Sequence, residues 1–159
     1  MAWTTPRTWA AAEVVTASLM NVHVRDNLKA LTEWTSYTPT WTATGGTPTI
    51  GNGTLTGDYI KTGQICHVRV TLTFGSTTSV SGTTVWQFSL PFTAVGPVAG
   101  SFTFYDASAA MQSGQTLRDS GGNTILAQTG ASAYIGATSP VTWATGDYGL
   151  LTATYRVAA

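Results

Sequence analysis

An amphipathic pattern marks the N-terminal part of the chain. The run 16–33 contains no glycine or proline, and its apolar spacing predicts a helix of about five turns at a rise of about 1.5 Å per residue. Thr16 is the expected N-cap, because its hydroxyl can accept a hydrogen bond from an amide of the first turn. The core positions repeat at alternating spacings of 3 and 4 residues, the heptad pattern of a helix that packs against parallel copies of itself. They are Ala17, Met20, Val24, Asn27, Leu31 and Trp34.

Two packing arrangements fit this helix. Leu19, Val22 and Leu28 widen its apolar surface beyond a narrow stripe, so the helix could lie along the β-domain of its own chain. We favour a parallel bundle of identical helices, because a lone polar residue such as Asn27 at a core position commonly fixes the register and the number of chains. The expected interface residues are then Met20, Val24, Asn27, Leu31 and Trp34.

Alternation of apolar and polar residues predicts strands through the rest of the chain. The clearest strand is 66–74, where Cys66, Val68, Val70, Leu72 and Phe74 share one side. Others are expected around 86–90, 102–104 and 151–157, and further ones near 37–44, 55–61, 109–117, 124–128 and 133–135, about eight or nine in all. Short strands with glycine-rich turns and no helical pattern between them predict a mostly β fold, a jelly-roll-like antiparallel β-sandwich. We therefore expect three parts: a segment over 1–15, a helical stalk over 16–34 and a β-sandwich domain over 35–159.

Composition points to a chain that is covered by partners. Hydrophobic residues make up 43% of the 159 residues, enough for one core, but charged residues make up only 9%, against a typical value of about 25%. A surface with so few charges is covered by neighbours or kept soluble by threonine and serine. Lys plus Arg and Asp plus Glu both number 7, so no basic excess exists to bind nucleic acid.

Targeting signals and disulfides are not expected. The first residues contain Pro6 and two tryptophans, without the continuous apolar core of a signal peptide. No apolar run approaches the roughly 20 residues that span a membrane, so no membrane partner is expected. The single cysteine, Cys66, has no partner for an internal disulfide.

The sequence contains few candidate catalytic residues. The β-domain carboxylates are Asp58, Asp106, Asp119 and Asp147, and three of them lie beside glycine or in turn sequences, where aspartate bonds the local backbone. His23, on the helix, and His67, on a strand, show no metal-ligand spacing. The sequence therefore predicts no enzyme, no cofactor and no metal site; catalysis by Asp58 and Asp147 is the last of the alternatives.

Aromatic residues near turns and strand ends are the remaining candidates for function in the β-domain. Exposed rings there could stack on sugars, or they could line subunit contacts, where tyrosine and tryptophan are favoured for the same amphipathic reason. Both uses stay open at this point. The candidate glycan contacts are Tyr105, Tyr134, Trp143 and Tyr148.

Two parts of the chain resemble proteins of tailed-phage virions. Residues 3–31 contain PRTW, EVVTA and NVHVRDNL in this order, similar to a segment that opens many virion proteins of phages and prophages, especially of actinobacterial type. The family has Val-Ala-Gly where this chain has Ala10–Ala12. The stretch 37–75, with FSLPF and WATGD after it, looks like a domain of minor tail and fibre-like proteins. The resemblance implies an N-terminal attachment segment, a trimeric β-rich body and a place on the outside of a phage particle.

Pattern and resemblance together predict a structural protein of the virion, made in the host cytoplasm. We expect a homotrimeric surface appendage, either a tail fibre or minor tail protein or a capsid fibre or spike. Trp3, Pro6 and Trp9 are expected to attach it to another virion protein, since large amphipathic rings concentrate binding energy. Two alternatives are a capsid decoration (cement) protein and a receptor-recognition module that binds a host cell-surface glycan.

Overall fold

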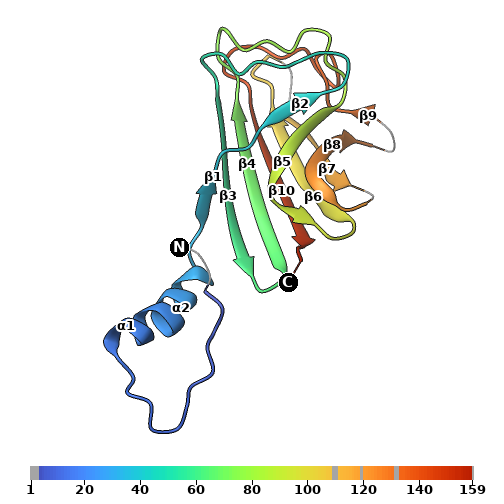
Figure 1. Cartoon of the computed structure of the whole chain (residues 1–159). Coiled ribbons are helices and arrows are strands. Elements are labelled where there is room, and N and C mark those ends of the chain that lie inside the picture. Colours follow the sequence, from blue (N-terminus) through green and yellow to red (C-terminus); the bar gives the residue numbers. More distant parts are fainter. Residues whose placement is uncertain (1–3, 109–110, 119, 131–132, 159) are drawn as a thin grey trace.

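A computed structural model describes residues 4–108, 111–118, 120–130 and 133–158. It shows a short helix that projects from one end of a β-domain (Figure 1). Trp3, one of the expected attachment residues, and Asp119 lie outside the described residues.

The helix forms in the expected place and has three consecutive segments. These are α1 (Ala17–Met20), the π-helical η1 (Asn21–Arg25) and α2 (Asp26–Ala30). Thr16 caps the helix as predicted, because its hydroxyl accepts a hydrogen bond from the Leu19 amide at 3.3 Å. The helix ends before Trp34, which was expected to belong to it.

The β-domain contains ten described strands, and their positions follow the predicted alternation. They are β1 (Thr35–Tyr37), β2 (Trp41–Ala43), β3 (Thr54–Thr62), β4 (Ile65–Thr73), β5 (Trp86–Ala94), β6 (Val98–Tyr105), β7 (Met111–Arg118), β8 (Gly122–Thr129), β9 (Ala133–Tyr134) and β10 (Tyr148–Arg156). Each pairs antiparallel with its neighbours. The domain is therefore antiparallel and mostly β, as predicted.

The strands form one curled sheet, whereas we expected two sheets packed face to face. The order is β1-β3-β4-β10-β6-β7-β8-β5-β2, with β9 beside β8. Because β1 and β2 follow each other in the chain but lie at opposite ends of this order, the chain crosses there from one edge to the other. Ser89 of β5 bonds the residues on both sides of this crossing. Its carbonyl accepts a hydrogen bond from the Tyr37 hydroxyl at 3.1 Å, and its amide donates one to the Thr40 carbonyl at 3.0 Å. The crossing thus joins the two edges.

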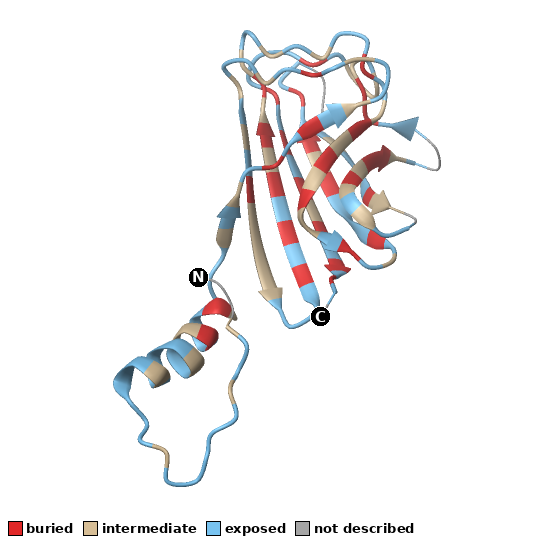
Figure 2. Ribbon diagram, viewed as in Figure 1, coloured by how far each residue is buried: buried red, intermediate tan, exposed pale blue. Residues whose placement is uncertain are grey.

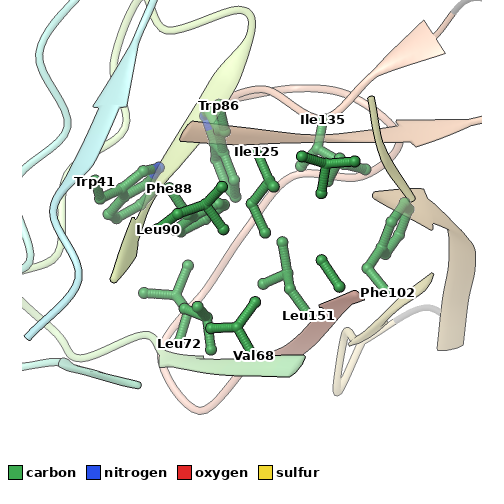
Figure 3. Packing of buried hydrophobic residues seen from close by; sticks show 14 of the residues in the cluster. Trp41, Val68, Leu72, Trp86, Phe88, Leu90, Phe102, Ile125, Ile135 and Leu151 are labelled. Atoms are coloured by element: carbon green, nitrogen blue, oxygen red, sulfur yellow. The ribbon is translucent and has the colours of Figure 1, made fainter. Parts of the chain in front are cut away.

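One hydrophobic core fills the inside of the curled sheet (Figures 2 and 3). The alternate residues from Cys66 to Phe74, in β4 and directly after it, were predicted to share one side and are all at most 4% exposed. Trp86 lies at the centre with its ring 4.8 Å from that of Trp41 and 5.2 Å from that of Trp143. Aromatic rings packed edge to face at such distances stabilise a core beyond their buried area.

The junction between helix and sheet is made by Trp34. Its ring lies 5.6 Å from that of His67, and the Arg69 guanidinium lies 5.3 Å from its centre. Arg69 also forms an ion pair with Asp58 at 3.2 Å. Asp58 was expected in a turn but lies within strand β3. The base of the helix is therefore held on the outside of β4.

Candidate functional site

The N-terminal segment lies along the helix of its own chain. We call residues 4–15 the N-terminal strap. The amide side chain of Asn27 holds both backbone groups of Thr4: its Oδ1 accepts from the Thr4 amide at 2.9 Å, and its Nδ2 donates to the Thr4 carbonyl at 2.8 Å. Nδ2 also donates to the His23 carbonyl at 3.1 Å. Asn27 is 5% exposed, so its polar groups are satisfied within one chain.

The middle of the strap is shaped by a turn and an ion pair. Arg7 and Glu13 are 2.6 Å apart, and the Glu13 amide donates to the Ala10 carbonyl at 3.2 Å. Ala12, in this turn, has a φ of 61°, a left-handed conformation that glycine adopts at less cost. It is the position at which the resembling family segment has glycine.

Two of the expected attachment residues lie on the strap beside the helix. Pro6 lines a shallow apolar hollow together with Val24, Leu28 and Leu31. The Trp9 ring meets the His23 ring edge-on at 6.3 Å, and 39% of Trp9 remains exposed. Part of the Trp9 side chain therefore remains open to another protein.

The expected interface residues of the helix fall into two groups. Met20 and Val24 are exposed, at 44% and 38%, whereas Asn27 is buried under the strap and Leu31 is half-buried. The π-helical turn at η1 explains this division, because a wider turn rotates the residues after it relative to those before it. Leu28, which was not assigned to the stripe, is 61% exposed.

The helix stands away from the sheet, with most of its surface exposed (Figure 2). The alternative in which it lies along its own β-domain is therefore not the arrangement in this structure. A helix of this length has little stability of its own in water and depends on packing. The exposed Met20, Val24 and Leu28 accordingly form a surface that a partner could cover.

Two candidate glycan contacts form a pair on the outside of the sheet. Tyr105 ends β6, Tyr148 begins β10, and the two are directly opposite in the antiparallel register. Their ring centres are 5.3 Å apart with an angle of 30° between the planes. Tyr105 is 41% and Tyr148 48% exposed, so both rings have faces open to the surroundings.

The other two candidates lie elsewhere. Trp143 is in the core, 9% exposed, with its Nε1 donating to the Gly136 carbonyl at 2.8 Å. It offers no ring face to a ligand, because the loop before β10 folds inward over Phe74, whose ring stacks on it at 5.4 Å. Tyr134, on β9, is 36% exposed and lines a hollow with the loop residues 136–139.

The acidic residues have structural partners. The carboxylate of Asp147, only 1% exposed, accepts from the Ala107 amide at 3.0 Å and the Ala144 amide at 2.7 Å. Asp106 accepts from the amide and the hydroxyl of Ser108, both at 2.7 Å. The bond from Ala144 to Asp147 is the local turn bond that the sequence predicted for this aspartate, whereas the bond from Ala107 joins residues 40 positions apart.

The remaining titratable side chains bear on metal binding and on thiol reactivity. Within the described residues, no cluster of three or more His, Cys, Asp or Glu could hold a metal ion. Cys66 is fully buried, and burial raises the pKa of its thiol, which keeps it protonated and unreactive. Among the described helices, none combines the length and the apolar character that a membrane crossing needs.

Two features of these surfaces could not be predicted from sequence motifs. The bond between Asn27 and Thr4 joins positions 23 residues apart, and the heptad pattern assigned Asn27 to a different contact. The pairing of Tyr105 with Tyr148 depends on which strands are neighbours, which alternation does not encode. The sequence did place both tyrosines near turns or at strand ends.

Comparison with known proteins gives one partial similarity. No family model matches the chain, and no solved structure matches it. The chain is 35% identical over 104 residues to the Mu-like prophage FluMu defective tail fiber protein of Haemophilus influenzae. This alignment spans 62% of the chain but only 16% of that protein.

Proposed function

We propose that this chain is a structural protein of a phage virion, a homotrimeric surface appendage of the tail fibre or minor tail type. The observation that carries the proposal is the projecting helix with Met20, Val24 and Leu28 exposed along it. An apolar stripe on a short, unsupported helix is expected to be covered by a partner. The partial similarity to a prophage tail fiber protein supports a tail-related role.

Three copies of the chain cover this stripe in the proposed trimer. Met20, Val24 and Leu28 face the threefold axis, and Leu31 and Trp34 lie toward the β-domain. Asn27 keeps its bonds to Thr4, so in each chain it holds the strap along the helix, with Pro6 bordering the stripe at Val24 and Leu28. A bundle of this kind supplies the packing that a single helix of about 20 Å lacks.

The strap is the proposed attachment to another virion protein. Pro6 and Trp9 lie against the helix, and the exposed part of Trp9 is available for a receiving surface. Arg7 lies 5.0 Å from the centre of the same ring and holds it in a defined position. Trp3 is proposed to join them. A large ring held in this way is a typical anchor of a protein interface.

The mass of the purified chain in solution tests the trimer. Multi-angle light scattering at micromolar concentration should give about 50 kDa, three times the chain mass of 16.6 kDa. The double variant Val24→Asn/Leu28→Asn should shift this mass to that of one chain, because the interface loses its apolar contacts. The matched control is Arg25→Asn/Lys29→Asn, which changes two neighbouring exposed polar residues and should leave the mass unchanged. A one-chain mass for the unchanged protein would refute the trimer.

The position of the protein in the particle tests the second part. Phage particles that carry a labelled copy of the chain should show the label on the tail in electron micrographs. A label spread over the capsid would instead favour a decoration protein, and particles without the protein should then lose heat tolerance.

A further inference from the structure

The tyrosine pair, Tyr105 and Tyr148, is surrounded by uncharged side chains. Met111 is opposite Tyr105 on β7, and Thr73 is opposite Tyr148 on β4. Two residues further along the strands, Thr103 and Leu150 form the next outward pair. The ion pair between Asp58 and Arg69 lies on the neighbouring strands β3 and β4. In the register of the sheet, these two residues are level with Thr152, four residues after Tyr148 on β10. The surface around the pair is therefore neutral, with hydroxyl groups beside the rings.

Buried carboxylates fix the strand ends that carry the pair. Asp147 directly precedes Tyr148, and Asp106 directly follows Tyr105. The Asp147 carboxylate accepts from the Ala107 amide, which belongs to the chain beyond β6, and from the Ala144 amide at the start of its own turn. This carboxylate joins the end of β6 to the start of β10, so the two rings are held together before any ligand arrives. A site fixed in advance loses less entropy on binding.

The pair lies at the end of the sheet away from the helix. Strand β10 starts at Tyr148 and runs toward the end of the domain where the helix projects (Figure 1). Thr154 of the same strand bonds His67 at 2.8 Å, and His67 contacts Trp34 at the base of the helix. The six residue steps from Tyr148 to Thr154 correspond to about 20 Å of strand. An appendage attached through its strap would thus present the tyrosine pair outward.

We propose that Tyr105 and Tyr148 form a platform that binds a neutral carbohydrate. The apolar C–H face of a pyranose ring would stack on the two ring faces, and Thr73 and Thr103 would bond the sugar hydroxyls. Anionic sugars are disfavoured, because none of the outward neighbours named above is a cation that could offset the loss of their hydration, and the charged residues next to the rings in the chain are the carboxylates Asp106 and Asp147. This inference rests on the proposed function, since it assigns the far end of the appendage to recognition of a surface glycan.

A glycan array with the full chain tests the ligand class. The array carries chitotetraose, maltotetraose, mannotetraose and a galactose tetrasaccharide, beside sialyllactose and a heparin tetrasaccharide. Retention of at least one neutral oligosaccharide and of neither anionic one is expected. Retention of none of the six, or of the anionic ones alone, would overturn the proposal.

Variants of the pair then locate the site. Tyr105→Ser/Tyr148→Ser should weaken binding of the retained oligosaccharide by about tenfold or more, measured by titration calorimetry, because both ring faces are lost. Tyr105→Phe/Tyr148→Phe keeps the ring faces and should bind within about threefold of the unchanged protein. Ile65→Ser removes an exposed apolar side chain at the opposite end of the pair formed by β4 and β10 and is the control. Circular dichroism checks that every variant is folded.

Light scattering of the same samples separates this inference from the proposed trimer. If the serine variant loses its three-chain mass, the pair is a subunit contact and the platform is refuted. If the unchanged protein is a single chain and still binds sugar through the pair, the trimer is refuted and the platform stands. Equal binding by the serine and phenylalanine variants would also refute the platform.

Discussion

Replacement of Asn27 by alanine should release the N-terminal strap from the helix. The Asn27 side chain makes two hydrogen bonds to the backbone of Thr4, and both disappear in Asn27→Ala. The third bond, to the His23 carbonyl, is lost as well, but it lies within the helix and does not hold the strap. The variant therefore removes the polar link between strap and helix and leaves the Arg7–Glu13 ion pair in place.

The size of the effect follows from these two bonds. Each contributes about 1 kcal/mol net, because the freed groups of Thr4 can bond water once the strap opens. The loss is about 2 kcal/mol, and since about 1.4 kcal/mol is a factor of ten, the population with an open strap should rise about 30-fold. The β-domain should keep its stability, because Asn27 contacts none of its strands through these bonds.

Cleavage by trypsin after Arg7 measures the open population, since proteolysis under native conditions follows the fraction of molecules that are locally open. The initial rate for Asn27→Ala should be about 10- to 30-fold higher than for the unchanged protein. Asn21→Ala, which replaces an exposed asparagine of the same helix, is the control and should leave the rate unchanged. A rate for Asn27→Ala equal to that of the control would refute the role assigned to Asn27. Light scattering of the variant shows in addition whether Asn27 contributes to the proposed trimer, as the heptad pattern predicted.

Three further predictions concern stability. Asp147→Ala should lower the free energy of unfolding by about 3 kcal/mol, which corresponds to a fall of roughly 6 to 12 °C in Tm. Asp58→Ala, at a partly exposed ion pair, should lower it by less than about 1 kcal/mol. Thermal melts compare the two variants. Ala12→Gly should slow tryptic cleavage of the strap, because glycine relieves about 0.5 to 1 kcal/mol of backbone strain at a φ of 61°. Burial raises the pKa of Tyr155 above the ordinary value of 10.0, so the stability it contributes is present below pH 10 and falls as the pH rises further. Urea midpoints between pH 8 and 11 should therefore fall less for Tyr155→Phe than for the unchanged protein.

Most of the strands could be predicted because their alternation is regular. In β4, the buried side of Cys66 to Phe74 and the exposed side with His67 and Arg69 are both as expected. The arrangement of the strands could not be predicted, since a curled sheet and a sandwich both require one apolar side on each strand. What distinguishes them here is the crossing of β1 and β2, which depends on bonds between Thr40 and Ser89, 49 residues apart.

The candidate site was predicted in part. The end of the helix was missed, because the heptad pattern runs through Trp34 while the backbone turns after Ala30. The local pattern also gives no sign of the π-helical turn, which changes the direction of Asn27. Trp143 shows the opposite difficulty: its position in a turn sequence suggested exposure, but packing against Trp86 and Phe74 places it in the core.

The short edge strands of the sheet limit how copies of this protein can join. The strand order ends on β1 and β2, each three residues long, so these end strands offer little backbone to an incoming strand. Long open edges invite strand addition from neighbouring molecules and lead to aggregation. With these end strands kept short, even a surface as poor in charge as this one can lie close to other copies with less tendency for their sheets to join. Contacts between copies are then left to side chains, whose identity can specify how many chains meet.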